Sequence, residues 1–243
     1  MGKDKLRRFA ENLTFECMVQ PPFEEVFRKD HNLKGRWGSD FFGNGNPIVL
    51  ELGCGRGEYT VALAERFPER NFIGIDIKGA RMWRGAKSAT ERGMRNVAFL
   101  RTRIEFITSF FAPGEVSEIW ITFPDPQLHK NRVKKRLTAP GFLAAYSQFI
   151  ASEGVIHLKT DSRPLHDYTL AVARCNDLPV WEECGDIYGA GLAAGLDSSG
   201  VARDLLSVRT AYEAQFLAKE MPITYMRFGL AGRTTFDEPD YVD

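Results

Sequence analysis

The chain has 243 residues, of which 44% are hydrophobic and 26% are charged, as is typical of one large soluble α/β domain or two small ones. The 32 Lys and Arg residues equal the 32 Asp and Glu residues in number, so a nucleic-acid site would require local clustering of charge. No apolar run reaches the roughly 18 residues that a membrane span needs, and the charged N-terminus lacks a secretory segment, so we expect a cytoplasmic protein that does not contact a membrane.

Residues 1–46 show no clear period and end in a loop rich in Gly and Asn, so we interpret them as a basic N-terminal arm and extension. From residue 47 onwards, short apolar runs alternate with segments of helical spacing. The alternation predicts strands at 47–53, 71–77, 96–101, 117–123, 154–160, 178–188 and 222–228, and helices at 56–68, 78–93, 104–114, 138–154, 163–176 and 211–220. Such an order is typical of an α/β fold with a doubly wound, mainly parallel sheet of seven strands, here in one domain over residues 47–243.

The segment ELGCGRG, residues 51–57, joins the first of these strands to the first helix. Its glycines, Gly53 and Gly55 among them, let the backbone turn sharply and approach a ligand closely. The third glycine of a dinucleotide fingerprint is missing at either possible position, which disfavours a pyrophosphate site. Glu51 suits a cationic or zwitterionic ligand, and Asp76, at the end of the second strand, can accept hydrogen bonds from both ribose hydroxyls. The pattern therefore predicts a nucleoside site.

The segment FPDPQLHKNRVKKRL, residues 123–137, holds one acid, Asp125, between two prolines that restrict its backbone. The carboxyl ends of parallel strands meet at one edge of a sheet, so we expect Asp125 to face the nucleoside site. A fixed acid for a base edge, with cations nearby for phosphates, is typical of a site that modifies a nucleic acid. The cations that follow it are His129, Lys130, Arg132, Lys134, Lys135 and Arg136.

Charge also clusters elsewhere. Between residues 78 and 103 there are eight cations and one acid, and residues 3–8 form a basic arm, which together favour a polyanionic partner. The four cysteines match neither a zinc site nor a disulfide framework, and the four histidines show no ligand spacing. We therefore expect reduced thiols and no metal site.

The segment FPDPQLHKNRVKKRL resembles the bacterial tRNA (guanine-N7-)-methyltransferase family, and the blocks VLELGCGRGEYT, NFIGIDIKGA, IHLKTD and TAYE agree with it in order. The resemblance covers roughly residues 47–228. It implies a Rossmann-like methyltransferase domain that uses S-adenosylmethionine, releases S-adenosylhomocysteine, binds tRNA and is a monomer or a homodimer. The methyl acceptor is then N7 of a guanine, by resemblance guanine 46 in the variable loop of the tRNA.

The resemblance also implies roles for single residues, with Asp125 as the active-site acid. The implied cofactor-binding residues are Glu51, Gly53, Gly55, Asp76, Arg103 and Asp125. The implied substrate-binding residues are His129, Lys130, Asp161, Thr210, Tyr212 and Glu213. The chain departs from the family pattern at three positions. Gln127 replaces a Trp, and Arg103 replaces an acid or an Asn. His129 replaces a Lys, which Lys130 can supply one residue later.

Guanine N7 carries a lone pair and no proton, so its attack on a sulfonium methyl group needs no general base. We expect Asp125 to accept hydrogen bonds from the guanine and to offset the positive charge that the purine gains. The structural alternatives are a turn acid at Asp125, a helix cap at Asp161, and a capping box formed by Thr210 and Glu213. The functional alternatives are an amino-nitrogen methyltransferase acting on another substrate, and a non-catalytic RNA-binding protein with the same fold.

Overall fold

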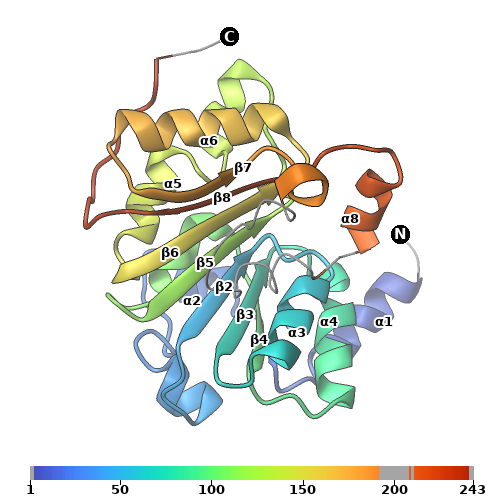
Figure 1. The fold of residues 1–243 in the computed structure, drawn as a ribbon. Helices are drawn as coiled ribbons and strands as arrows, with labels where there is room; N and C mark the ends of the chain where they lie inside the picture. Colours follow the sequence, from blue (N-terminus) through green and yellow to red (C-terminus); the bar gives the residue numbers. More distant parts are fainter. Residues whose placement is uncertain (1–2, 192–207, 209–210, 241–243) are drawn as a thin grey trace. The chain divides into compact units, whose positions relative to one another are not determined.

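The computed structural model describes residues 3–191, 208 and 211–240 (Figure 1). The chain divides into two compact units, a first unit of residues 1–116 and a second unit of residues 117–243. The proposed boundary between an extension (1–46) and a methyltransferase domain (47–243) stays a prediction.

The first unit is a parallel α/β layer. Its strands are β1 (Met18–Val19), β2 (Ile48–Leu52), β3 (Asn71–Asp76) and β4 (Val97–Arg101), in the order β1-β4-β3-β2, and every pairing is parallel. Its helices are α1 (Lys3–Asn12), α2 (Phe23–Val26), α3 (Glu58–Arg66) and α4 (Gly79–Glu91), with a π-helical turn η1 (Trp37–Phe42) and a 3-10 helix η2 (Ile104–Ser109). All five residues of β2 are buried, as expected for a parallel strand that is covered on both faces.

The N-terminal arm is a helix that packs on the first unit. In Figure 1, α1 lies beside α4, and Asn12 Nδ2 donates a hydrogen bond of 2.9 Å to the Gly79 carbonyl. Glu11 accepts hydrogen bonds from Trp83 Nε1 at 2.8 Å and from Lys87 Nζ at 2.9 Å, and the Arg8 guanidinium lies 4.9 Å from the centre of the Trp83 ring. Residues 1–46 therefore contain a helix that the sequence analysis did not predict, because the segment shows no clear period. These contacts of the helix are hydrogen bonds and a cation–π contact.

The second unit is a mixed α/β layer. Its strands are β5 (Val116–Thr122), which begins at the unit boundary, β6 (Ile150–Thr160), β7 (Val180–Cys184) and β8 (Thr224–Gly229), in the order β5-β6-β8-β7, and β8 is antiparallel to both of its neighbours. Its helices are α5 (Pro140–Tyr146), α6 (Arg163–Cys175) and α8 (Ala211–Leu217), with a 3-10 helix η3 (Lys130–Lys135) and a π-helical turn η4 (Ile187–Gly191).

Several predicted elements are too long. The helix expected over 104–114 is a 3-10 helix that ends at Ser109. The helix expected over 138–154 ends at Tyr146, because residues from Ile150 onwards belong to β6, whose pairing in the sheet overrides their local pattern. The strand expected over 178–188 ends at Cys184, and a π-helical turn follows it. These corrections leave the order of elements unchanged.

The predicted fold class is confirmed, since strands alternate with helices and the pairings of the first unit are all parallel. The described residues contain eight strands instead of seven, because the two-residue strand β1 adds to the edge of the first unit. None of the helices in the described ranges is long and apolar enough to cross a membrane.

Candidate functional site

The glycine loop between β2 and α3 lies against the end of β3. The amide groups of Gly53 and Cys54 both donate to the Ile75 carbonyl, at 2.8 and 3.0 Å. Gly53, Gly55 and Gly57 have φ angles of 77°, 56° and 69°, in the left-handed region that side chains with a Cβ disfavour. The loop therefore needs glycine at each of these positions for its backbone path.

The three glycines differ in what surrounds them. A Cβ on Gly57 would collide with the ring of Phe99, so this glycine lets α3 pack closely on β4. At Gly53, no described atom lies within 4 Å of the position that a Cβ would take, and the residue is exposed. The backbone at Gly53 therefore borders open space, whereas Gly57 has a packing role.

Glu51 is buried beneath the loop and holds the start of α3. It is only 5% exposed, and its Oε2 accepts hydrogen bonds from the Thr60 amide at 2.9 Å and from the Thr60 hydroxyl. A carboxylate at a helix N-terminus satisfies free amide groups and interacts favourably with the helix dipole. No local pattern indicates Thr60 as the partner of Glu51, because the pair is formed across the loop.

Asp76, at the end of β3, is hydrogen-bonded to the glycine loop. Its Oδ2 accepts a hydrogen bond from the Gly55 amide at 3.0 Å, and its Oδ1 accepts one from the Lys78 amide at 2.7 Å. The next residue, Ile77, is 52% exposed although it is apolar. Its place in NFIGIDI, directly after the acid, is the only sequence signal for this exposed apolar side chain.

Arg103 lies at the N-terminus of η2 and is exposed. Its guanidinium forms an ion pair of 3.2 Å with Glu105 and lies 5.9 Å from the centre of the Phe106 ring. The structure therefore places Arg103 after β4, as predicted, and gives its side chain two local contacts.

Cys54, within the glycine loop, is not poised to act as a nucleophile. Burial raises the pKa of its thiol well above the usual value, and the charges of Glu51 and Asp76 raise it further. The thiolate is the reactive form, so a protonated Cys54 is chemically inert at neutral pH.

Asp125 is exposed in the turn that follows β5. Its Oδ1 accepts a hydrogen bond of 3.1 Å from the Gln127 amide, so it does act as a turn acid. Phe123 and Gln127 have positive φ angles of 46° and 48°, which are strained for residues that are not glycine. An ionised carboxylate has about four lone-pair sites, so this bond leaves capacity for a ligand.

One predicted member of the basic run is not at the surface. Arg136 is only 5% exposed; its Nε donates to the Pro126 carbonyl at 3.1 Å, and its guanidinium lies 4.3 Å from the centre of the Tyr168 ring. Arg136 therefore holds the turn that carries Asp125 and does not belong to an RNA-facing patch. We define the exposed basic patch as His129, Lys130, Arg132, Lys134 and Lys135.

Asp161 follows β6 and is not a helix cap. The N-cap of α6 is Ser162, whose side-chain oxygen accepts a hydrogen bond of 3.4 Å from the Leu165 amide. Burial raises the pKa of Asp161 above its usual value. The capping alternative for Asp161 is therefore wrong.

Glu213 lies in α8, where it is fully buried and paired. Lys159 Nζ lies 2.7 Å from its Oε1, and both side chains are 0% exposed. Lys159 was not predicted as a site residue, because its only sequence signal is its place in LKTD. Thr210 and the side chain of Tyr212 lie outside the described residues, so the capping box stays a prediction.

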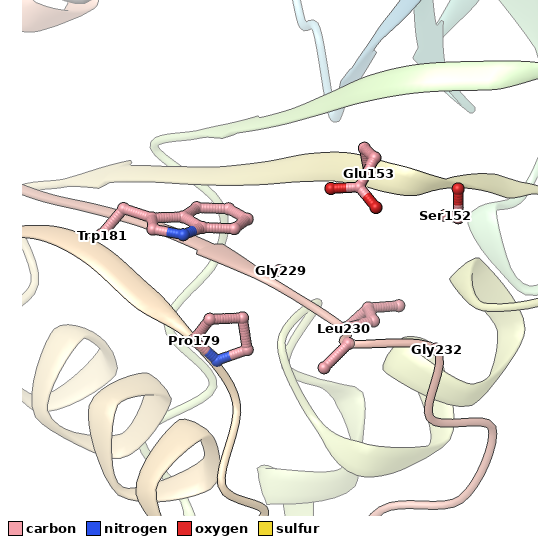
Figure 2. Close-up of a pocket in the computed structure, with 9 residues that line it drawn as sticks. Ser152, Glu153, Pro179, Trp181, Gly229, Leu230 and Gly232 are labelled. Carbon is pink, nitrogen blue, oxygen red and sulfur yellow. The ribbon is translucent and has the colours of Figure 1, made fainter.

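The second unit also contains a pocket of about 410 Å³ at the start of β6, lined by Glu153, Pro179, Trp181 and Leu230 among others (Figure 2). Glu153 lies near the start of β6 and Asp161 directly follows its end, eight positions later, which corresponds to about 26 Å along an extended chain. The pocket is therefore far from Asp161. Within the described ranges, no group of three or more His, Cys, Asp or Glu side chains is placed to hold a metal ion.

Residues 45–183 match the model of a protein family described as "Putative methyltransferase". The tRNA (guanine-N(7)-)-methyltransferase of Porphyromonas gingivalis is 53% identical over 229 residues, which are 93% of this chain and 87% of the relative. That of Bacteroides thetaiotaomicron is 47% identical over 240 residues, which are 99% of this chain and 91% of the relative. The chain belongs to the tRNA (guanine-N7)-methyltransferase family.

Membership of this methyltransferase family confirms the resemblance predicted from five motifs. The fold agrees as well: a solved structure of an antibiotic-related methyltransferase has a TM-score of 0.55 and 15% identity, and covers 78% of this chain and 90% of that chain. Within the family frame, the first unit carries Glu51, the glycine loop and Asp76, and the second unit carries Asp125, Asp161 and Glu213.

Proposed function

We propose that this protein transfers a methyl group from S-adenosylmethionine to N7 of a guanine in tRNA, in the cytoplasm. The observation that carries the proposal is the similarity to tRNA (guanine-N(7)-)-methyltransferases over nearly the whole chain, with 47% identity over 240 residues to the relative from Bacteroides thetaiotaomicron. The finer proposal, from the resemblance, is that the acceptor is guanine 46 of the variable loop.

The residues of the first unit fit the methyl donor. Gly53 presents exposed backbone with open space above it, and Asp76 lies at the end of β3, where its carboxylate can accept hydrogen bonds from ribose hydroxyls. The exposed side chain of Ile77 offers an apolar surface to an adenine ring. Glu51 contributes indirectly, because it holds the loop and α3 in place through Thr60.

When bound, the donor supplies an electrophilic methyl group on a positively charged sulfur. No residue has to remove a proton from guanine N7, since that atom has none. Asp125 would accept hydrogen bonds from the N1 and N2 donors of the guanine and would offset the positive charge that develops on the purine. Asp161 is proposed as a further residue of the substrate side, and Glu213, which is fully buried, is proposed to act on that side through its ion pair with Lys159.

The exposed basic patch is proposed to hold tRNA phosphates. It comprises five side chains on and just before η3, and η3 follows the turn that carries Asp125. Lys130 directly follows His129, so it can supply the ammonium group that the family has one residue earlier. Phosphate contacts fix the position of a nucleic acid, while contacts to the base edge select the guanine.

The test is incubation with unmodified tRNA and a donor labelled in its methyl group, followed by borohydride and aniline treatment, which cleaves the strand at N7-methylguanosine. We expect one cleavage site in wild-type product and none when guanine 46 is replaced by adenine. Asp125→Asn should lower kcat about 100-fold, whereas Asp177→Asn, at an exposed acid of the second unit, should not.

Several results would contradict the proposal. Label on an exocyclic amino group would favour the amino-nitrogen alternative, and cleavage at another guanine would reject the proposed position. Tight tRNA binding without any S-adenosylmethionine binding in calorimetry would favour a non-catalytic RNA-binding protein.

A further inference from the structure

Helix α8 is joined to β6 by a buried ion pair. Lys159 Nζ and Glu213 Oε1 are 2.7 Å apart, and neither side chain is exposed. Two more groups converge on the pair: the Tyr188 hydroxyl donates to Glu213 Oε1 at 2.5 Å, and Lys159 Nζ donates to the Val208 carbonyl at 3.3 Å. Because a buried Lys or Glu is costly without its partner, this network strongly favours one placement of α8.

A second contact joins α8 to the end of β5. The rings of Phe216 and Phe123 are stacked, with centroids 6.0 Å apart and planes at 15°. Phe123 is held at a φ of 46°, and its amide donates to the Lys159 carbonyl at 2.8 Å. Lys159 and Phe123, which both contact α8, are therefore hydrogen-bonded neighbours at the ends of two strands.

Each of these contact residues lies two positions before a candidate site acid. Lys159 precedes Asp161, and Phe123 precedes Asp125. A shift of α8 would thus be transmitted to both acid-bearing segments, and a shift of about 1 Å near reacting groups is enough to lower a rate about 100-fold.

We propose that Lys159 and Phe216 are positioning residues of the methyl transfer. Lys159, acting through Glu213, and Phe216, acting through Phe123, fix α8 against the segments that carry Asp161 and Asp125. This inference rests on the proposed function, but the anchoring of α8 can be measured without it. The main role of Glu213 is then to form the ion pair with Lys159.

The test compares Lys159→Met, Glu213→Gln and the double variant that carries both changes. Each single variant should lower kcat/KM for tRNA about 100-fold. The kcat/KM of the double variant should be no lower than that of the less active single variant. The effects of substituting two residues that act through each other are not additive. The affinity for S-adenosylmethionine, measured by calorimetry, should stay unchanged. The matched controls are Lys219→Met and Glu220→Gln, which replace exposed residues just after α8 and should keep wild-type activity.

Amide hydrogen exchange of residues 211–217 supplies a readout that does not require activity. Exchange there should rise in Lys159→Met and fall back toward wild type in the double variant, which no longer buries an unpaired charge. Phe216→Leu, which removes only the ring stacking, should lower kcat/KM about threefold to tenfold. This variant tests the anchoring of α8 even if Lys159→Met does not fold.

Three results would overturn the inference: unchanged exchange in α8, activity of Lys159→Met or Phe216→Leu at the wild-type level, or losses that multiply in the double variant. A wild-type protein that does not methylate tRNA would instead overturn the proposed function, and the exchange measurement would still decide whether Lys159 anchors α8.

Discussion

Single residues of the glycine loop are constrained for different physical reasons. Gly57 is fixed by its positive φ and by the ring of Phe99, whereas Gly53 is fixed by its positive φ alone and faces open space. The loop pattern in the sequence predicted the turn but could not separate these two roles, because Phe99 lies on another strand. Alanine substitutions at Gly57 and Gly53 distinguish the two roles.

Gly57→Ala should therefore destabilise the protein by about 2–4 kcal/mol, the sum of a left-handed backbone cost and an overpacking cost. Gly53→Ala, the matched control, should cost only about 1 kcal/mol but should weaken S-adenosylmethionine binding, since its Cβ would enter the proposed ligand space. Urea unfolding and calorimetry measure the two effects. Equal stability losses in the two variants would contradict the packing role of Gly57.

Asp161 allows a prediction that depends on pH. Burial raises the pKa of Asp161 in the folded state, so its protonated form favours folding and its contribution to stability is lost as pH rises through the folded-state pKa. Asp161→Asn, which stays neutral, should raise the melting temperature near neutral pH, and the gain should shrink as pH falls toward the ordinary carboxyl range.

The same Asp161→Asn variant should methylate tRNA more slowly, because a charged acceptor is lost. Melting curves and initial rates across pH check both statements. A variant that is less stable than wild type near neutral pH would show that the charged form of Asp161 stabilises the fold.

At the residue scale, the sequence predicted acids and glycines but not their partners. Asp76 and Asp125 were predicted because the first ends a strand and the second follows one, and that position alone suggests a site. Thr60, which binds Glu51, and Lys159, which binds Glu213, were missed because these pairs form between segments that no local pattern links.

At the scale of elements, η3 shows that a run of cations is not one functional unit. Arg136, which caps this 3-10 helix, is buried against Tyr168 and the Pro126 carbonyl, while Lys134 in the same run is exposed. A list of charges in a sequence cannot make this distinction, because it depends on which side chains the turn folds inward.

Arg136→Met should consequently destabilise the protein by about 2–4 kcal/mol through lost hydrogen bonds and lost cation–π attraction. Lys134→Met, the exposed counterpart, should change stability by less than about 0.5 kcal/mol. Denaturant titration of both variants provides the measurement, and a stable Arg136→Met protein would refute the structural role of Arg136.

Element boundaries were the weaker part of the prediction. The first four residues of β6, 150–153, were assigned to the preceding helix, whereas the rest of the strand was predicted, because the start of a strand leaves little local signal beside a helical pattern. Strand β1 was missed for a related reason: two residues are too short to show a period, and only their pairing with Phe99 and Leu100 of β4 defines the strand.

At the scale of the whole molecule, the balanced charge means that RNA binding must depend on a local surface. Replacing both Lys134 and Lys135 with Gln should reduce the slope of log K against log salt concentration by about 2 for tRNA binding, one unit for each lost phosphate contact. Fluorescence anisotropy over a salt series measures this slope.

The control for the salt series is a protein with Lys29→Gln and Lys219→Gln, which changes net charge equally at exposed lysines outside the patch. An equal reduction of the slope in the control would show that overall charge, and not the exposed basic patch, governs binding.

The close packing around Phe99 has a consequence for how the sequence can vary. Its ring occupies the volume that a Cβ would need at Gly57 and also at Gly85, where Phe99 Cζ would lie 2.7 Å away. Side chains at these three positions would therefore occupy the same volume, although the positions are up to 42 residues apart in the chain. Across homologous sequences, we expect positions 57, 85 and 99 to co-vary, so that a bulkier residue at either glycine occurs only with a smaller residue in place of the phenylalanine.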